Sequence, residues 1–194
     1  MKYLILCICL ALTACSKTVM WEEEVPLNTG DVIWVKRYVT YKLQGASGNP
    51  MDIAYRPDWT EEISFEWKGK KYRYVGDADL MLLAISPLTQ RPVLVAHAAN
   101  KDWHWKHNYR CTTPFYVQIL PSAEGRDSSW PPSIEPWLYS MPHNLMRGRD
   151  DAEKMKTRYT AEDRRIRDQA WAVDPSASSS AHIDPTLKSD NCFK

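Results

Sequence analysis

The stretch of residues 97–111 (HAANKDWHWKHNYRC) holds the densest group of side chains that could do chemistry in this sequence. His104 and His107 lie three residues apart, so they would share one face of a helical turn. With Asp102 they would supply three ligands of the kind that hold catalytic zinc. No H-E-x-x-H or C-x-x-C pattern accompanies them, so a solvated loop without a cofactor is the competing interpretation.

Cys111 closes the same stretch and suggests a second chemistry. A thiol beside His97, His104 or His107 would form a thiol-dependent hydrolase. Such a nucleophile usually lies at a helix start, where the thiolate is stabilised. Cys111 instead precedes a predicted strand, and Cys192 is available as a disulfide partner. A hydrolase is therefore an alternative rather than the favoured interpretation.

Two tryptophans in this stretch suggest a binding role. Trp103 and Trp105 would point to the same side of an extended segment. With Trp130 or Trp137 they would form a stacking platform for a sugar ring, such as that of peptidoglycan. The chain has nine Trp and ten Tyr but three Phe, a balance that suits binding grooves and half-buried sheet faces equally. Core packing is the competing interpretation.

The first residues of the chain indicate its location in the cell. Lys2 precedes an apolar run over residues 3–12, which is much shorter than the roughly 20 residues that span a bilayer as a helix. Such a run is typical of a signal peptide. Residues 12–15 (LTAC) resemble the lipobox of bacterial lipoproteins. This resemblance implies cleavage before Cys15 and attachment of lipid, palmitate included, to that residue.

The resemblance to lipoproteins also implies a compartment. Several acyl chains on one residue make a stable membrane anchor, whereas a single chain gives marginal binding. In Gram-negative lipoproteins the residue after the cysteine influences sorting, and Ser16 is compatible with the outer membrane, facing the periplasm. Cys7 and Cys9 would leave with the signal peptide. Cys111 and Cys192 would then be the two thiols left in an oxidising compartment, which predicts one disulfide, with two unpaired thiols as the alternative.

Charge narrows the range of partners. The chain has 25 basic and 24 acidic residues, and Lys2 leaves with the signal peptide. A net charge near zero argues against nucleic-acid binding, which needs a basic surface. Residues 15–194 are enough for one domain with a core.

Most of the chain is predicted to form antiparallel strands that position these side chains. The first hairpin spans residues 21–27 and 31–43, with a Thr29-Gly30 turn that sets Glu22 opposite Arg37. The second hairpin is the clearest, because residues 63–67 and 70–75 alternate cleanly around a Lys68-Gly69 turn. Further strands are expected over residues 79–86, 92–99 and 113–120, and a loop over residues 44–58. About seven strands suggest an antiparallel sandwich or open barrel.

The C-terminal third of the chain is predicted to contain a proline-rich segment and a helix in place of strands. Five prolines exclude regular structure over residues 121–142, whose large apolar side chains should pin the segment to the body. Within it, residues 134–139 (IEPWLY) resemble segments of uncharacterised proteobacterial lipoproteins, a resemblance that implies no activity. An amphipathic helix is expected over residues 150–173, with a capping box at Thr160–Asp163 that could restart it.

The predicted organisation is a signal peptide (1–14), a lipidated tether (15–20), a single mainly β domain with a C-terminal helix (21–173) and a flexible tail (174–194). No G-x-S-x-G, Ser-x-x-Lys or phosphate-loop pattern is present. The sequence therefore favours a non-catalytic envelope protein that binds another protein or stabilises an assembly. The alternatives are a glycan-binding module that uses Trp103 and Trp105, and a metal- or thiol-dependent hydrolase that uses residues 97–111.

Overall fold

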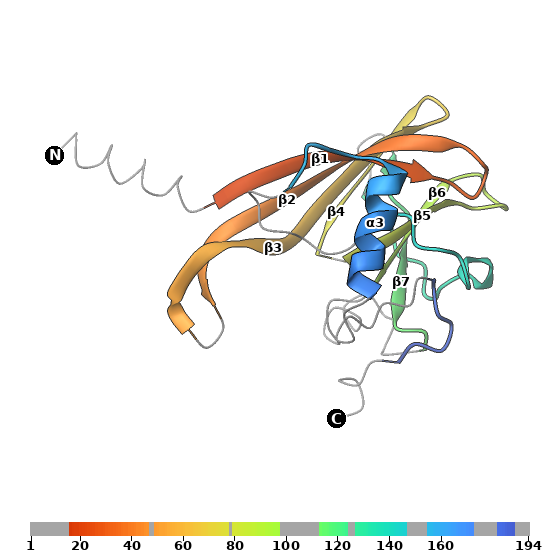
Figure 1. Ribbon diagram of the computed structural model, residues 1–194. Coiled ribbons are helices and arrows are strands. Elements are labelled where there is room, and N and C mark those ends of the chain that lie inside the picture. The colour runs from red at the N-terminus through yellow and green to blue at the C-terminus, as the bar shows by residue number, and fades with distance from the viewer. Residues whose placement is uncertain are drawn as a thin grey trace.

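The computed structural model describes residues 16–46, 49–77, 79–97, 113–123, 127–146, 155–172 and 182–188. In these ranges nine strands form two sheets, followed by one α-helix (Figure 1). The elements are β1 (Ser16–Pro26), β2 (Val32–Ala46), β3 (Asn49–Trp67), β4 (Lys70–Gly76), β5 (Asp79–Ile85), β6 (Pro92–His97), β7 (Tyr116–Ile119), β8 (Ser122–Ala123), the 3-10 turn η1 (Pro136–Leu138), β9 (Arg158–Tyr159) and α3 (Ala161–Ala172). The larger sheet has the order β8-β4-β3-β2-β1-β9, and the smaller has the order β5-β6-β7.

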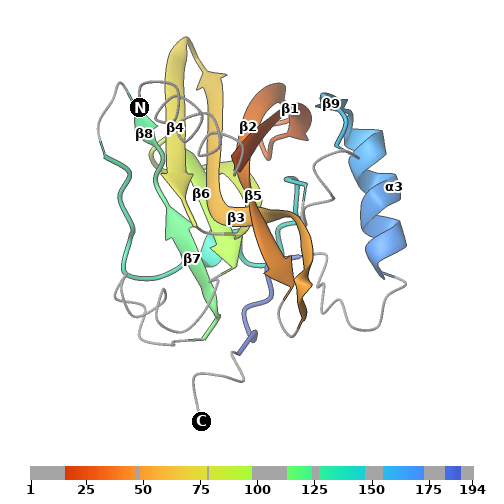
Figure 2. The ribbon, with the colours of Figure 1, turned by 90° about the vertical axis from the view of Figure 1, so that its left-hand side faces the viewer.

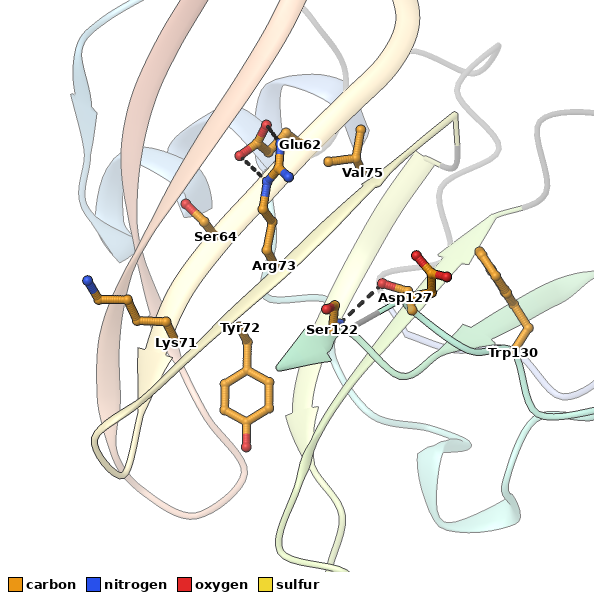
Figure 3. Close-up of a pocket in the computed structure, with 10 residues that line it drawn as sticks. Glu62, Ser64, Lys71, Tyr72, Arg73, Val75, Ser122, Asp127 and Trp130 are labelled. Atoms are coloured by element: carbon orange, nitrogen blue, oxygen red, sulfur yellow. Dashed lines mark hydrogen bonds and ion pairs between the residues drawn. The ribbon is translucent and has the colours of Figure 1, made fainter. Parts of the chain in front are cut away.

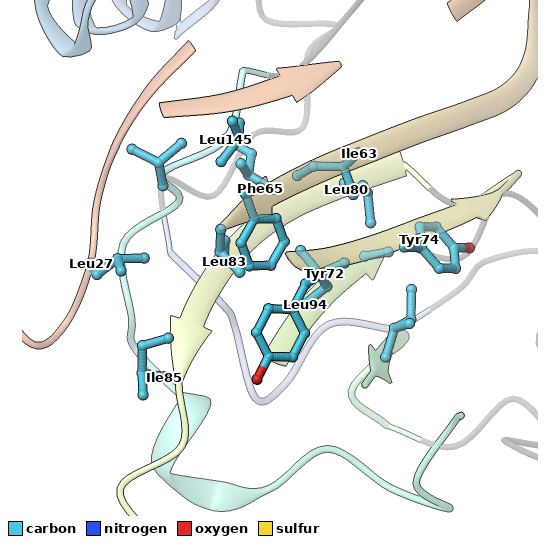
Figure 4. Packing of buried hydrophobic residues seen from close by; sticks show 14 of the residues in the cluster. Leu27, Ile63, Phe65, Tyr72, Tyr74, Leu80, Leu83, Ile85, Leu94 and Leu145 are labelled. Carbon is cyan, nitrogen blue, oxygen red and sulfur yellow. The ribbon is translucent and has the colours of Figure 1, made fainter. Parts of the chain in front are cut away.

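The two sheets share one core, so the predicted mainly β fold is confirmed as a sandwich. Strand alternation turns apolar side chains of β3 and β4 toward those of β5 and β6 (Figure 4). The rings of Phe65 and Tyr72 are stacked, with their centroids 5.6 Å apart. Other buried members of this core include Ile63, Tyr74, Leu80, Leu83, Ile85, Leu94 and Leu145.

The proline-rich segment covers the other face of the smaller sheet. Ile134 and Leu138 are buried there against β5 and β6, and Trp137 and Tyr139 pack at the margin. This confirms the prediction that the large apolar side chains of the segment pin it to the body. The smaller sheet is therefore buried on both faces, which explains why β5 and β6 are continuously apolar in sequence. The prediction that the prolines of the segment exclude regular structure is wrong, because β8 and η1 lie within residues 121–142 and Pro136 is tolerated at the first position of η1.

The β3–β4 hairpin has the predicted register. Lys68 and Gly69 both have positive φ angles, 49° and 72°, as a two-residue type I′ turn requires. That turn fixes the pairing of every residue behind it. The predicted pairs are all observed: Ile63–Tyr74, Ser64–Arg73, Phe65–Tyr72 and Glu66–Lys71.

The β1–β2 hairpin differs from the prediction by one residue. The predicted turn set Glu22 opposite Arg37, whereas Glu22 lies opposite Lys36 in the structure. The reason is a three-residue loop in which the Gly30 N–H donates to the Leu27 carbonyl (3.1 Å) and Gly30 has φ 88°. A one-residue slip exchanges the two faces of a strand, so Arg37 points into the protein instead of toward solvent.

The predicted loop over residues 44–58 is wrong. β2 continues to Ala46 and β3 begins at Asn49, so the two strands pair almost to the tip of a long hairpin. Leu43, Met51 and Ile53 are exposed there, and the strand pairing defines the hairpin. The sequence of this stretch, with turn-forming residues such as Gly45, does not show that pairing. Figure 1 shows this hairpin extending away from the body.

Two asparagine side chains cover the outer edge of β5. The Asn28 amide donates to the Ile85 carbonyl (2.9 Å) and accepts from the Ile85 N–H (2.7 Å). The Asn144 amide donates to the carbonyls of Leu83 (2.7 Å) and Pro26 (2.8 Å) and accepts from the Leu83 N–H (2.8 Å). Each amide replaces a residue of a neighbouring strand, so this edge is not open to pairing with another chain.

The C-terminal helix is shorter than predicted. α3 begins at Ala161, and β9 pairs in parallel with β1 just before it (Figure 2). Tyr159 is buried against Trp21 and Tyr41, and this packing favours extended backbone over helix at residues 155–160. The apolar face expected of an amphipathic helix is not fully docked on the body either, because Ile166 is 55% exposed. Polar contacts attach α3 instead: the Ala161 N–H donates to the Glu24 carboxylate (3.0 Å).

The predicted capping box of α3 is confirmed, and it makes the helix sensitive to acid. The Thr160 N–H donates to the Asp163 carboxylate (2.9 Å), and the Asp163 N–H donates to the Thr160 hydroxyl (3.1 Å). The backbone hydrogen bond from Thr160, and then bonds from Lys156 and the Thr160 hydroxyl, lower the pKa of Asp163 to about 2.

Because that pKa is depressed in the folded chain, the carboxylate contributes stability above its unfolded pKa and loses it as pH falls toward 2. We expect the difference in free energy of unfolding between the wild type and Asp163→Asn to be constant near neutral pH. Between about pH 4 and pH 2 it should shrink toward zero. Urea unfolding of both proteins at successive pH values measures this difference, and a pH-independent difference would contradict it.

The segments predicted as a tether and a tail also make contacts. Ser16–Met20 belongs to β1 and pairs with β2 from its first residue. Ile183 is fully buried, and its N–H donates to the Met141 carbonyl (3.0 Å). The Phe115 N–H donates to the Leu187 carbonyl (2.9 Å). Residues 182–188 therefore lie against the smaller sheet.

Candidate functional site

A groove runs beside β4 on the solvent face of the larger sheet, and we call it the β4 groove (Figure 3). Its volume is about 790 Å³. One wall comes from the solvent side of the β3–β4 hairpin, and the other comes from β8 and the segment that follows it. The lining residues are Glu62, Ser64, Lys71, Tyr72, Arg73, Val75, Ser122, Asp127, Ser128 and Trp130.

Strand alternation places the polar wall of the β4 groove. Residues of β3 and β4 that do not enter the core point to the other face of the sheet. Arg73 lies opposite Ser64 in the register, and its guanidinium reaches diagonally to Glu62. The two side chains form a bidentate pair, with the Nε and one terminal nitrogen of Arg73 each 2.8 Å from a carboxylate oxygen of Glu62. The type I′ turn at Lys68 fixes this geometry because it fixes the register.

The charges of the β4 groove are of both signs. The hydrogen bond with Glu62, and then the charge of Glu62, raise the pKa of Arg73. Arg73 stays 62% exposed, so the pair adds little stability, but its fork of donors is held in one orientation. Lys71 on the same wall and Asp127 on the other add one charge of each sign.

The second wall is held to β4 by backbone pairing. Ser122 lies opposite Arg73 in the short β8–β4 ladder. The Ser128 hydroxyl accepts from the Ser122 N–H (3.2 Å), and Leu120 and Ser129 exchange backbone hydrogen bonds of 2.8 and 3.1 Å. Trp130 follows, half-buried against the core between the sheets, and it also lines the groove. The β4 groove thus combines hydrogen-bonding groups with one aromatic side chain.

A second cluster of titratable groups is buried in the larger sheet. Arg37 is held between the carboxylates of Glu23 and Glu61, and all three side chains are about 3% exposed or less. The Arg37–Glu23 contact is 2.5 Å, and the Met146 N–H donates to the second oxygen of Glu23 (2.9 Å). The Arg37 guanidinium also lies over the Trp21 ring, 5.4 Å from its centroid.

The electrostatics of this buried cluster favour the charged forms. Burial lowers the pKa of Arg37, but the charges of Glu61 and Glu23 and their hydrogen bonds raise it above its usual value. Arg37 therefore stays protonated inside the protein. Because the cluster is enclosed by packed side chains, it holds β1, β2 and β3 together and is not a site open to ligands.

The site residues predicted from sequence lie outside the described ranges. These are Cys15, Asp102, Trp103, His104, Trp105, His107, Cys111 and Cys192. His97 is described at the end of β6, where its ring packs edge-on against Phe115 and Tyr116, with centroid distances of 5.7 and 6.1 Å. Within the described ranges, no three His, Cys, Asp or Glu side chains are grouped to hold a metal ion.

The disulfide between Cys111 and Cys192 stays a prediction. Both cysteines lie outside the described residues, and the hydrogen bond between Phe115 and Leu187 joins the described segments next to them. Cys111 lies four residues before Phe115, and Cys192 lies five residues after Leu187. Short spans of chain can bring two such residues within disulfide distance.

The β4 groove was missed in the sequence because its polar wall resembles an ordinary solvated strand face. The cross-strand pair of Ser64 and Arg73 was a usable signal, since it puts a guanidinium beside small and acidic groups. Nothing in the local sequence places Asp127 or Trp130 across from it. Trp137, the other tryptophan considered for a stacking platform, lies on the far side of the smaller sheet and donates to Glu135 (2.5 Å).

No family model matches the chain, and no curated protein or solved structure matches it either. Among the described residues, no helix has the length and apolar character needed to cross a bilayer.

Proposed function

We propose that this chain is a lipoprotein of the bacterial envelope, anchored by lipid at Cys15 and facing the periplasm from the outer membrane. Its β domain has a non-catalytic role and binds a segment of another envelope protein in the β4 groove. The observation that carries this proposal is that Arg73 and Trp130 line one groove. Arg and Trp are among the residue types that dominate the binding energy of protein interfaces.

The geometry of β4 supports a protein partner. β8 pairs with β4 at Tyr72 and Arg73, so the outer edge of β4 already accepts an extended segment. A partner segment lying along the groove would meet fixed charges of both signs and the hydroxyls of Ser64 and Ser128. Such a pattern selects for a complementary sequence and orientation, which suits the recognition of a particular protein.

The position of Trp130 favours glycan binding as a second candidate. An indole at the edge of a groove with hydroxyl and carboxylate groups is a suitable surface for a sugar ring. Trp103 and Trp105, predicted to share one side of an extended segment, would extend this surface. Peptidoglycan is the glycan that a periplasm-facing domain would meet.

Charge reversal in the β4 groove tests the protein-binding proposal. We expect Arg73→Glu to reduce cross-linked co-purification of a partner from intact envelopes by about tenfold or more. Arg165→Glu is the matched control, because Arg165 forms a similar exposed bidentate pair with Glu162 (2.6 and 2.7 Å) far from the groove. Equal losses for the two variants, or no stoichiometric partner for the wild type, would contradict protein binding.

The glycan candidate has a separate readout. Trp130→Leu keeps an apolar side chain against the core but removes the aromatic face. If glycan occupies the groove, this variant should lose binding to purified peptidoglycan. Retained glycan binding by Trp130→Leu would remove Trp130 from the stacking surface.

A further inference from the structure

The paired ends of β2 and β3 form an arm that leaves the body of the protein. We define the arm as residues 43–46 of β2 and 49–55 of β3. Among the residues that the structure describes, β1 pairs with β2 as far as Ser16–Lys42, and the arm beyond that pair is a two-stranded ribbon. Figure 1 shows it curving out on the side of the molecule where β1 begins.

One face of the arm is apolar and exposed. Leu43 lies opposite Tyr55, and Ile53 lies two residues before Tyr55, so all three share a face of the ribbon. Met51 lies farther toward the tip, in the irregular part of the ladder between the pairs Gly45–Ile53 and Ala46–Asn49. The exposed fraction rises toward the tip, from 44% for Leu43 to 61% for Ile53 and 86% for Met51. Leu43 and Ile53 continue the buried face that contains Tyr41, and they carry it into solvent.

The base of the arm is also where the lipid anchor begins. Cys15 is bonded to Ser16, which lies opposite Lys42, the residue before the arm. One residue of extended chain spans about 3.5 Å, so acyl chains on Cys15 would start beside the base of the arm. An anchored protein would then hold the arm within reach of the membrane that carries the anchor.

The charges at this end suit an anionic lipid surface. Lys17 and Lys42 are both exposed at the base of the arm. Between Lys42 and Arg56 the sequence has a single acidic residue, Asp52. Basic residues beside an apolar surface favour contact with anionic headgroups, and the apolar side chains add burial at the interface.

We propose that the arm docks on the lipid surface, with Leu43, Met51 and Ile53 placed among the headgroups and the adjoining acyl chains. This inference rests on the proposed lipid anchor at Cys15. A two-stranded ribbon has backbone groups along its outer edges that need water or headgroups as partners, so the arm lies in the interface and does not enter the hydrocarbon core. The anchor alone tethers the domain, and the arm fixes which face of the domain points to the periplasm.

An environment-sensitive fluorescent amino acid, introduced by codon suppression in the full-length protein, tests the arm. It replaces Met51 in one protein and Leu88 in the control. Leu88 is 83% exposed in the β5–β6 turn, on the opposite side of the molecule in Figure 1. The acylated proteins are reconstituted in vesicles of phosphatidylethanolamine and phosphatidylglycerol.

We expect a blue shift and several-fold weaker quenching by iodide at position 51, with neither change at position 88. Adding Ile53→Asp should reverse the change at position 51, because it places a charge on the inserted face. A probe at position 51 that stays accessible to iodide on these vesicles would overturn the proposal. Protection of position 51 in native envelopes but not on pure lipid would also overturn it, because a protein would then cover the arm.

Failure of the lipid anchor has a different signature. Flotation with vesicles that is lost in Cys15→Ser, combined with a water-exposed position 51, would keep the anchor and remove the arm. If Cys15 carries no lipid, the same probe is read after vesicles are added to the unacylated protein. A blue shift at position 51 would then keep the arm as an independent lipid contact, and its absence would overturn it.

Discussion

Replacing Arg37 by methionine is expected to lower the free energy of unfolding by about 3–5 kcal/mol. Arg37 is the cation between two buried carboxylates, those of Glu23 and Glu61. Without it, two negative charges face each other in a region that water does not reach. Methionine fills much of the volume of the arginine stem, so the loss reports mainly the uncompensated charge. Urea unfolding followed by circular dichroism measures it.

Arg73→Met is the matched control for this prediction. Arg73 also forms a bidentate pair with a glutamate on the same sheet, but it is 62% exposed. The variant should therefore lose less than about 1 kcal/mol. Equal losses for the two arginine variants would contradict the role assigned to the buried cluster.

A triple replacement separates charge from packing in the buried cluster. Changing Glu23 and Glu61 to leucine in the Arg37→Met background removes all three charges and keeps an apolar interior. Most of the lost stability should return, because apolar groups often replace a buried ion cluster without net cost. Recovery should be incomplete, since the Met146 N–H would lose its acceptor on Glu23.

Replacing Asn144 by alanine should cost about 2–4 kcal/mol. The Asn144 side chain makes three hydrogen bonds, to both backbone groups of Leu83 and to the Pro26 carbonyl. Asn144 is 6% exposed, so water does not readily replace these bonds. The variant leaves one buried donor and two acceptors without their partner at the junction of the two sheets.

Asn28→Ala is the control for Asn144→Ala. Asn28 makes the equivalent pair of bonds to Ile85, two residues farther along β5, but its side chain lies at the surface. Water can take the place of that exposed amide, so we expect a loss of about 1 kcal/mol. Urea unfolding of both variants measures the two losses, and a larger loss for Asn28→Ala would contradict the account of this edge.

The sequence predicts secondary structure correctly where turn and capping residues next to each other in the chain determine it. The β3–β4 hairpin follows from clean alternation around Lys68-Gly69, and the Thr160–Asp163 box follows from capping chemistry. The predicted β1–β2 register is wrong by one residue because Asn28 belongs to the loop. Its side chain there binds β5, which is distant in the sequence. The same slip hid the buried cluster, since it turned Arg37 toward solvent.

Tertiary contacts explain the other differences. Packing of Tyr159 against Trp21 keeps residues before α3 extended, although their spacing is helical. The arm contains turn-forming residues, and only the backbone pairing between its β2 and β3 strands shows that it is a ribbon. The β4 groove depends on bringing Trp130 beside Arg73, two residues that no local pattern connects.

The most direct test of the account is the mass of the N-terminal peptide of the mature protein, taken from envelopes of cells that express the full-length chain. We expect Cys15 to be the first residue and to carry acyl chains, and we expect Cys15→Ser to abolish both cleavage and acylation. An unmodified Cys15, or a mature protein that begins elsewhere, would contradict the central claim that the β domain is held at the membrane by lipid.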